Sequence, residues 1–215
     1  MKKGILFDLD GTLLDSLCDL HRCVNHTLRQ YGCPERSMEE IRRFVGNGAR
    51  RLLEQSLPGL PTDPDTDQVL ESYTAYYNAH CKENTRPYPG VVEALTALRK
   101  HYPIAVVSNK PQDSVTELCK EFFADVHAVG TRPDCPRKPA PDMLQNAMAA
   151  IGADTCIYVG DSEVDVRTAQ NTGIPCLSVL WGFRDRETLE KAGAIHFCEN
   201  TEDLQTHIEN LLKAL

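Results

Sequence analysis

The sequence has no basic tract and no long run of apolar residues. Its 215 residues include 31 acidic side chains but only 23 Lys and Arg, so the formal net charge is -8. Proteins that hold nucleic acid by counterion release need clustered basic residues, and we therefore expect no nucleic-acid partner. The apolar stretch near the N-terminus, 4–7, is too short for a secretion signal or a membrane span. The sequence thus predicts a cytoplasmic protein without a membrane partner.

Cysteine is plentiful, but the spacing of a metal site is lacking. The nine cysteines are an odd number, and no pair shows the C-x-x-C spacing that is common in zinc sites. Isolated cysteines of this kind act as small apolar residues in a reducing compartment. We therefore predict a packing role for them rather than a zinc site.

The sequence contains instead a series of short apolar runs separated by helical segments. Runs of β-branched and aliphatic residues occur at 4–7, 104–107, 126–129, 156–159 and 175–180. Such runs are typical of strands buried on both faces of a parallel sheet. Segments with helix start or stop signals lie at 111–122, 141–150 and 163–171. The alternation predicts an α/β fold with a Rossmann-like open parallel sheet.

Residues 15–86 follow a different pattern. They contain no convincing strand, and their periodicity is helical, with Ser37 and Glu40 spaced as a capping box. The segment from Pro58-Gly59-Leu60-Pro61 to Pro64 is expected to separate two of the helices. The sequence therefore predicts a core formed by 1–14 and 87–215, with an all-helical cap domain inserted at 15–86.

The first predicted strand ends at two acidic residues, Asp8 and Asp10, which are followed by Gly11 and Thr12. Two aspartates at this spacing mean little by themselves, but open α/β sheets bind ligands at the carboxyl ends of their strands. The glycine allows the backbone to turn tightly around a ligand. Carboxylate oxygens at a strand end can hold Mg²⁺, which keeps waters and a substrate phosphate as its remaining ligands.

Two further segments place polar groups near strand ends. Ser108 and Asn109 follow the second apolar run and precede a helix with proline near its start. A hydroxyl and backbone N–H groups in this position suit a phosphate, although simple capping of the helix explains them equally well. Lys138 lies on a proline-rich loop before the next helix, and an isolated lysine of this kind is usually solvated.

A fourth segment combines Gly160, Asp161 and Asp165 at the end of another predicted strand. These acids could merely cap the following helix and interact with its dipole. However, all four segments fall at the carboxyl ends of strands in one sheet, so their side chains are expected to meet at one edge. A shared site explains that convergence, whereas four separate structural roles do not.

The four segments resemble, in order, the four motifs of the haloacid-dehalogenase-like superfamily. The matching residues are Asp8-x-Asp10-Gly11-Thr12, Ser108-Asn109, Lys138-Pro139 and Gly160-Asp161-x-x-x-Asp165. The helical insert resembles the cap of the first type in that superfamily. Three stretches look most like bacterial phosphoglycolate phosphatases, namely Val45-Gly46-Asn47-Gly48, Tyr88-Pro89-Gly90 and Ser108-Asn109-Lys110-Pro111.

The resemblance implies a Mg²⁺-dependent phosphatase for a small phosphorylated metabolite, with 2-phosphoglycolate as the expected substrate. Asp8 would be the nucleophile that forms an aspartyl phosphate. Asp10 would protonate the leaving alcohol and then activate the attacking water. The metal would be held by the side chains of Asp8 and Asp161 and by the backbone carbonyl of Asp10, with Asp165 either at the metal or holding Lys138. Lys138 would act as a catalytic residue by supplying positive charge near the phosphate.

Residues that bind the substrate are expected in both parts of the chain. By the resemblance, Ser108 and Asn109 hold the transferred phosphate. In the insert, Asn47, Gly48 and Arg50 are candidates for contacting the leaving group, because the N-terminus of the following helix could meet a carboxylate. The glycines there could equally well do no more than end one helix and start the next.

Several related functions share such a core. Phosphatases for sugar phosphates, nucleotides or pyrophosphate would have the same four motifs, and so would a phosphomutase of the superfamily. A phospho-accepting signalling domain also combines aspartates, a hydroxyl and a lysine on a parallel sheet, although it carries no helical insert after its first strand. The sequence is compatible with a monomer or a homodimer.

Overall fold

The computed structural model of the chain describes residues 1–59, 62–124 and 126–215, which divide into two compact units. One unit comprises Met1–Leu14 and Pro87–Leu215, and the other comprises Asp15–Arg86. The chain passes between them through two short strands, β2 (Leu14–Asp15) and β3 (Arg86–Pro87), which pair with each other. The roles of catalytic core and cap for these units stay a prediction.

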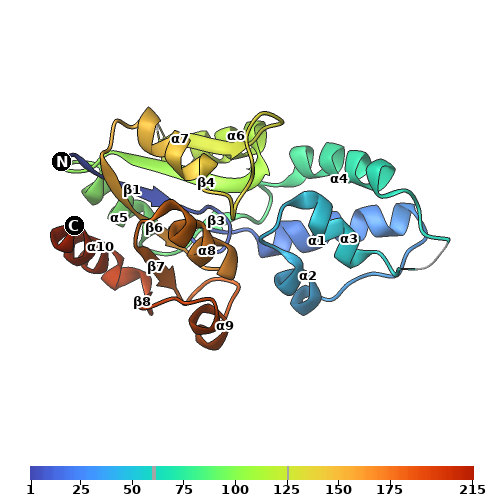
Figure 1. Cartoon of the computed structure of the whole chain (residues 1–215). Coiled ribbons are helices and arrows are strands. Elements are labelled where there is room, and N and C mark those ends of the chain that lie inside the picture. Colours follow the sequence, from blue (N-terminus) through green and yellow to red (C-terminus); the bar gives the residue numbers. More distant parts are fainter. Residues whose placement is uncertain (60–61, 125) are drawn as a thin grey trace. The chain divides into compact units, whose positions relative to one another are not determined.

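The larger unit is built on a six-stranded parallel sheet (Figure 1). In spatial order the strands are β5 (His127–Thr131), β4 (Ile104–Pro111), β1 (Lys3–Phe7), β6 (Thr155–Gly160), β7 (Cys176–Val179) and β8 (His196–Cys198). Five of them correspond to the apolar runs of the sequence, so the predicted α/β class and the open parallel sheet are confirmed. Strand β8 was not predicted, because it has only three residues at the sheet edge and only Cys198 among them is buried.

Helices alternate with these strands. They are α5 (Val91–Leu98), α6 (Gln112–Phe123), α7 (Asp142–Ala150), α8 (Glu163–Thr172), α9 (Arg186–Lys191) and α10 (Leu204–Ala214), with a short 3-10 helix, η1 (Thr201–Asp203). The three helices expected from start and stop signals form within two residues of their predicted limits. Helix α8 ends where glycine was expected to stop it, since Gly173 adopts a left-handed conformation with φ of 77°.

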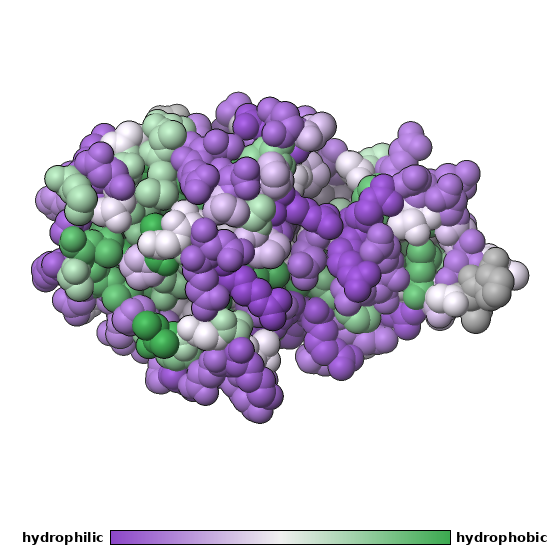
Figure 2. Space-filling model, viewed as in Figure 1, coloured by the Kyte–Doolittle hydropathy of each residue, from purple (hydrophilic) through white to green (hydrophobic). Residues whose placement is uncertain are grey.

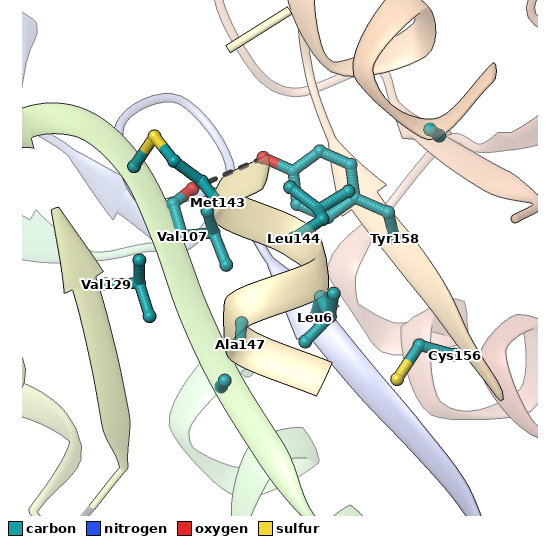
Figure 3. Close-up of a cluster of buried hydrophobic side chains, with 10 residues drawn as sticks. Leu6, Val107, Val129, Met143, Leu144, Ala147, Cys156 and Tyr158 are labelled. Carbon is teal, nitrogen blue, oxygen red and sulfur yellow. Dashed lines mark hydrogen bonds between the residues drawn. The ribbon is translucent and has the colours of Figure 1, made fainter. Parts of the chain in front are cut away.

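The core of this unit lies on both faces of the sheet. On one face, α7 packs Met143, Leu144 and Ala147 against strand residues that include Leu6 and Tyr158 (Figure 3). Alternate residues of a strand point to opposite faces. The intervening strand residues, among them Ile5, Phe7, Val106, Ile157 and Val159, are buried as well. Both faces are therefore covered, which explains why the strands read as continuous apolar runs.

The described residues of the smaller unit form four helices, α1 (Leu17–Gln30), α2 (Met38–Phe44), α3 (Ala49–Ser56) and α4 (Thr66–His80). The predicted capping box is present, because Ser37 accepts a hydrogen bond from the Glu40 amide and the Glu40 side chain accepts one from the Ser37 amide. The proline- and glycine-rich segment separates α3 from α4 as expected, although Leu60 and Pro61 within it lie outside the described residues. Buried side chains such as Val69 and Tyr73 form the interior of this unit.

The surface carries few large apolar side chains. Those exposed among the described residues are Met1, Met38, Val92, Ile195 and Leu215. On the face shown in Figure 2, hydrophilic residues predominate and hydrophobic ones occur in small groups. Within the described parts of the chain, the helices are all too short or too polar to span a bilayer.

Candidate active site

Strand register brings the predicted functional residues to the same edge of the sheet. Phe7, the last residue of β1, pairs with Val106 of β4 on one side and with Val159 of β6 on the other, so the segments that follow these three residues leave the sheet side by side or continue along it at the same edge. Asp8 follows directly and is held in line by a hydrogen bond from its amide to the Val159 carbonyl, 2.8 Å. The residues towards the carboxyl ends of β1, β4 and β6 therefore lie close together at one edge of the sheet.

Lys138 lies at the centre of this group rather than in solvent. Its side chain is only 3% exposed, and its Nζ is 2.8 Å from Oδ1 of Asp8 and 2.8 Å from Oδ1 of Asp165. It also lies 2.8 Å from the hydroxyl of Tyr158 and 3.3 Å from the Val107 carbonyl. Burial alone would lower the pKa of Lys138, but the charges of Asp165 and Asp8 raise it above its usual value. The lysine is thus a fixed positive charge beside Asp8.

Asp165 holds Lys138 and caps helix α8 at the same time. Its Oδ1 accepts from Lys138 and from the Tyr158 hydroxyl, which is 2.9 Å away. Its Oδ2 accepts from the amide and the hydroxyl of Ser162, at 3.1 and 2.6 Å. One oxygen of Asp165 therefore belongs to the capping box of α8, whose N-cap residue is Ser162, and the other holds Lys138, while a catalytic role for this arrangement stays a prediction.

Asp161 is enclosed by backbone from two loops. Its Oδ2 accepts a 2.7 Å hydrogen bond from the Phe183 amide, and its Oδ1 lies 3.4 Å from the Thr12 hydroxyl. A Cβ atom on Gly11 would lie 2.2 Å from Oδ2 of Asp161, and one on Gly182 would lie 2.3 Å from the Asp161 Cβ. Both positions require glycine, since nothing larger lets the loops come this close.

Three buried carboxylates converge and could hold a metal ion. Asp8, Asp161 and Asp165 each offer an oxygen, and these atoms lie within 4.8 Å of one another. Burial, with the charge of Asp165 as the next cause, raises the pKa of Asp8 well above its usual value and that of Asp161 to about 7. Carboxyl groups that resist ionisation in this way lack sufficient positive charge nearby.

The charge count of the site fits a divalent cation. Asp10 does not join the converging oxygens, because its Oδ1 pairs with Lys110 at 3.1 Å. The four aspartates of the site and its two lysines together leave two negative charges uncompensated when all are ionised. Hard oxygen ligands with that surplus suit Mg²⁺. The side chain of Asp10 pairs with Lys110, and the backbone carbonyl of Asp10 stays the predicted metal ligand.

Ser108 and Asn109 lie in the second half of strand β4 and are nearly buried, at 2% and 7% exposed. The Asn109 amide group donates to the Lys138 carbonyl at 3.1 Å, which ties this strand end to the lysine loop. Helix α6 begins at Gln112, has Pro111 at its N-cap and shows no side-chain capping bond. The two residues therefore do not cap that helix, and their role in binding phosphate stays a prediction.

The candidate substrate-binding residues of the smaller unit lie between the end of α2 and the first turn of α3. Gly48 is the N-cap residue of α3 with φ of 83°, so the glycine at this junction is needed for the backbone turn. Asn47 precedes it, and Arg50 forms an ion pair with Asp67. The glycine therefore has the structural role of starting helix α3. Contact of Asn47, Gly48 or Arg50 with a substrate stays a prediction.

Sequence reasoning missed several residues of this site. Tyr158 looked like one apolar position of a strand, yet a buried tyrosine hydroxyl needs a polar partner, and that requirement could have indicated it. The loop after β7 was missed as well. It brings the Phe183 amide to Asp161, and it brings the Trp181 indole N–H to the Thr12 carbonyl at 3.1 Å. Apart from Gly182, its sequence gives no signal of this role, because the loop acts through backbone groups and through the space that the glycine leaves.

Known proteins share both the sequence pattern and the fold. Residues 5–179 match the family model described as haloacid dehalogenase-like hydrolase. A phosphoglycolate phosphatase from Rhodobacter capsulatus is 34% identical over 86% of this chain and 87% of its own length. One from Cereibacter sphaeroides is 33% identical over 95% of this chain and 98% of its own length. A crystal structure from Lactobacillus delbrueckii, assigned as a phosphoglycolate phosphatase, superposes with a TM-score of 0.88 at 35% identity and covers 97% of this chain and 99% of its own.

Proposed function

The chain belongs to the haloacid dehalogenase-like hydrolases and is a phosphoric monoester hydrolase, and we propose that it hydrolyses 2-phosphoglycolate to glycolate and phosphate. The observation that carries the chemistry is Asp8 at a strand end, buried beside Lys138 and within reach of Asp161. The substrate is proposed from the relatives that bear this activity in their names. We place the enzyme in the cytoplasm, where free cysteines such as those of this chain persist.

Asp8 acts as the nucleophile in this proposal. One of its carboxylate oxygens attacks phosphorus, the bond from phosphorus to the alcohol oxygen breaks, and an aspartyl phosphate forms. Two anions must approach each other in this step. Lys138, at 2.8 Å from Asp8 and fixed by Asp165 and Tyr158, supplies a positive charge that needs no rearrangement as the reaction proceeds.

Asp10 acts as the general acid and then as the general base. It gives a proton to the alcohol oxygen as that oxygen leaves, and it later removes a proton from the water that attacks the aspartyl phosphate. A carboxyl group in this role has to lie beside the metal site rather than within it. That requirement is met by Asp10, whose carboxylate pairs with Lys110 and not with the cluster of Asp8, Asp161 and Asp165.

Mg²⁺ is the proposed metal. The carboxylates of Asp8 and Asp161 would hold it, with the backbone carbonyl of Asp10 as a further ligand, while we assign Asp165 to holding Lys138. When bound, the cation offsets the negative charge of the substrate phosphate and of Asp8. Ser108 and Asn109 would then bind phosphate oxygens at the end of β4, next to the loop that carries Lys138.

A phosphate-release screen over small monoesters with Mg²⁺ tests this function. We expect multiple turnover with 2-phosphoglycolate as the preferred substrate, and loss of activity in the presence of a chelator. A preference for a sugar phosphate, a nucleotide or pyrophosphate would overturn the substrate. Isomerisation of a sugar phosphate without phosphate release would indicate a phosphomutase, and a phospho-Asp8 that persists for minutes would indicate a signalling role.

A further inference from the structure

Lys110 is a buried lysine to which the mechanism above gives no role. It lies at the end of strand β4, two residues after Ser108. Its side chain is only 10% exposed, and its Nζ lies 3.1 Å from Oδ1 of Asp10, whose side chain is 11% exposed. Exposed ion pairs contribute little free energy, whereas in a buried pair the removal of one partner deprives the other charge of a close counter-charge where water cannot replace it.

The two buried lysines of the site are directed at different carboxylates. Lys138 contacts Asp8 and Asp165, whereas Lys110 contacts Asp10. The carboxylate that attacks phosphorus and the carboxylate that transfers protons therefore each have a separate ammonium partner. Attraction of the substrate phosphate does not by itself require Lys110 to contact Asp10, so the pairing indicates a role that involves Asp10.

The backbone at both ends of the Asp10–Lys110 pair is fixed. Around Asp10, the Gly11 amide donates to the Leu14 carbonyl at 2.9 Å, which closes the turn after β1. The Lys110 amide donates to the Ser108 hydroxyl at 3.3 Å, and the Lys110 carbonyl accepts from the Thr131 hydroxyl at 3.2 Å. With both backbones held, the ion pair contributes to fixing the direction in which the Asp10 carboxyl group points.

We propose that Lys110 is a positioning residue that orients Asp10 for proton transfer to the leaving alcohol. The inference rests on the proposed function, in which Asp10 is the acid. Lys110 engages Oδ1 of Asp10 and so fixes the plane of the carboxyl group that transfers the proton. As the bond between phosphorus and the alcohol oxygen breaks, that oxygen keeps the electron pair and takes a proton from the Asp10 carboxyl group, and Asp10 regains a proton later from the attacking water.

Two substrates of similar size, which differ in whether the leaving group needs a proton, distinguish the orientation of Asp10 from phosphate binding or a purely structural role for Lys110. 2-Phosphoglycolate releases an alkoxide and needs a proton, whereas acetyl phosphate releases acetate, a stable anion that leaves without one. The measurement is kcat/KM for both substrates in the wild type and in Lys110→Met, because this ratio covers only the steps up to release of the first product. Thermal unfolding of each variant checks the fold, and Lys110→Gln replaces Lys110→Met if the latter does not fold.

We expect Lys110→Met to lower kcat/KM for 2-phosphoglycolate by about 10- to 100-fold, the size of effect that follows misplacement of an acid. For acetyl phosphate we expect a loss below about threefold, since general acid catalysis contributes little there. Lys110→Arg, which retains the charge, is expected to recover most of the activity. The matched control is Lys120→Met, because Lys120 is an exposed lysine of α6 and its loss is expected to leave both values unchanged.

Equal losses on the two substrates would overturn the proposal and make Lys110 a phosphate-binding or structural residue. Unchanged kcat/KM for 2-phosphoglycolate would overturn it too. The proposed function fails separately, if the wild type itself does not hydrolyse 2-phosphoglycolate. In that event the comparison with acetyl phosphate is made with whichever alkyl phosphate the wild type prefers.

Discussion

Buried aspartates occur in both units of the chain, but their surroundings differ. In the helical unit, Asp19 is fully buried, and it accepts hydrogen bonds from the amides of Asn84 and Thr85 and from both of their side chains, at 2.8 to 2.9 Å. Burial alone would raise the pKa of Asp19, but these hydrogen bonds lower it below its usual value. In the sheet unit, Asp8 and Asp161 have raised pKa values.

The difference shows what each site is built for. Asp19 has every hydrogen bond it needs from its own unit, so its charge contributes to folding. Asp8 and Asp161 are placed close to Asp165 and to each other, which costs free energy unless a cation binds. Repulsion between buried carboxylates is typical of a binding site. A buried carboxylate whose hydrogen bonds are all formed within the protein is typical of a structural role.

The largest expected effect is the loss of activity in Asp8→Asn. We expect kcat/KM to fall by about 10⁴-fold or more, because the nucleophile is gone. The fold should persist, because the loss of the ion pair with Lys138 is offset by removal of a buried charge that Asp165 and Asp161 repel. The comparison variant is Asp19→Asn, which should keep its kcat. Near wild-type turnover by Asp8→Asn would show that Asp8 is not the nucleophile.

The next largest effect is expected on stability, in Asp19→Ala. This change leaves the buried amide of Thr85 and the nearby donors of Asn84 without an acceptor. We expect the free energy of unfolding to fall by about 3 kcal/mol, measured by urea denaturation. Asp161→Asn, measured in the absence of metal, should be no less stable than the wild type. If Asp161→Asn lowered the free energy of unfolding more than Asp19→Ala does, Asp161 rather than Asp19 would be the stabilising carboxylate, and the comparison would be wrong.

A smaller effect is expected from Gly182→Ala, which tests the loop after β7. The added methyl group would collide with Asp161 and with the Gly11 carbonyl. We expect Mg²⁺ affinity, measured by calorimetry, to fall by about 10- to 100-fold, as for other changes around a ligand residue. Gly32→Ala is the control, because its Cβ meets nothing within 4 Å although φ is +68°. It should lose some stability and no metal affinity.

The smallest expected effect is a difference in pH dependence. Because the folded-state pKa of Asp161 is raised to about 7 from 3.8, the metal-free protein loses stability from this group as pH rises between those values, with no further loss above about 7. Asp19 acts in the opposite direction, since its contribution is present above its unfolded-state pKa and disappears as pH falls through its lowered pKa.

Thermal unfolding with and without Mg²⁺ at pH 6 and pH 8 measures this difference. Protons compete with the metal for Asp8 and Asp161, so the stabilisation by Mg²⁺ should be larger at pH 8. The Asp161→Asn variant should show a much weaker dependence on pH. A shift in melting temperature with Mg²⁺ that is the same at both pH values would argue against the cation at these carboxylates.

Much of the fold could be predicted because its signals are local. Strands buried on both faces appear as apolar runs, and helix α8 ends at the glycine that was expected to stop it. Strand β8 was missed because three residues with one buried side chain carry no periodicity. The short pair β2 and β3 was missed for the same reason, since two-residue strands depend on their partner and not on their own sequence.

The site was predictable in part. The order of Asp8, Ser108, Lys138 and Asp161 along the chain, each towards or after the carboxyl end of a strand, placed these residues at one edge, because the strands of a parallel sheet all point the same way. The pairing of carboxylates with lysines was not predictable. Whether Asp165 pairs with Lys138, and Asp10 with Lys110, depends on distances between segments that lie far apart in the chain.

The sequence by itself determined that strand ends would present carboxylates, a lysine and a hydroxyl together, since hydrophobic patterning dictates the sheet and the sheet aligns its ends. Only the tertiary structure decided which of those carboxylates repel one another and which are neutralised. That outcome depends on burial and on contacts of about 3 Å between distant segments, such as Lys110 with Asp10 and the Phe183 amide with Asp161. Electrostatic energy changes steeply over such distances, and no local pattern in a sequence encodes them.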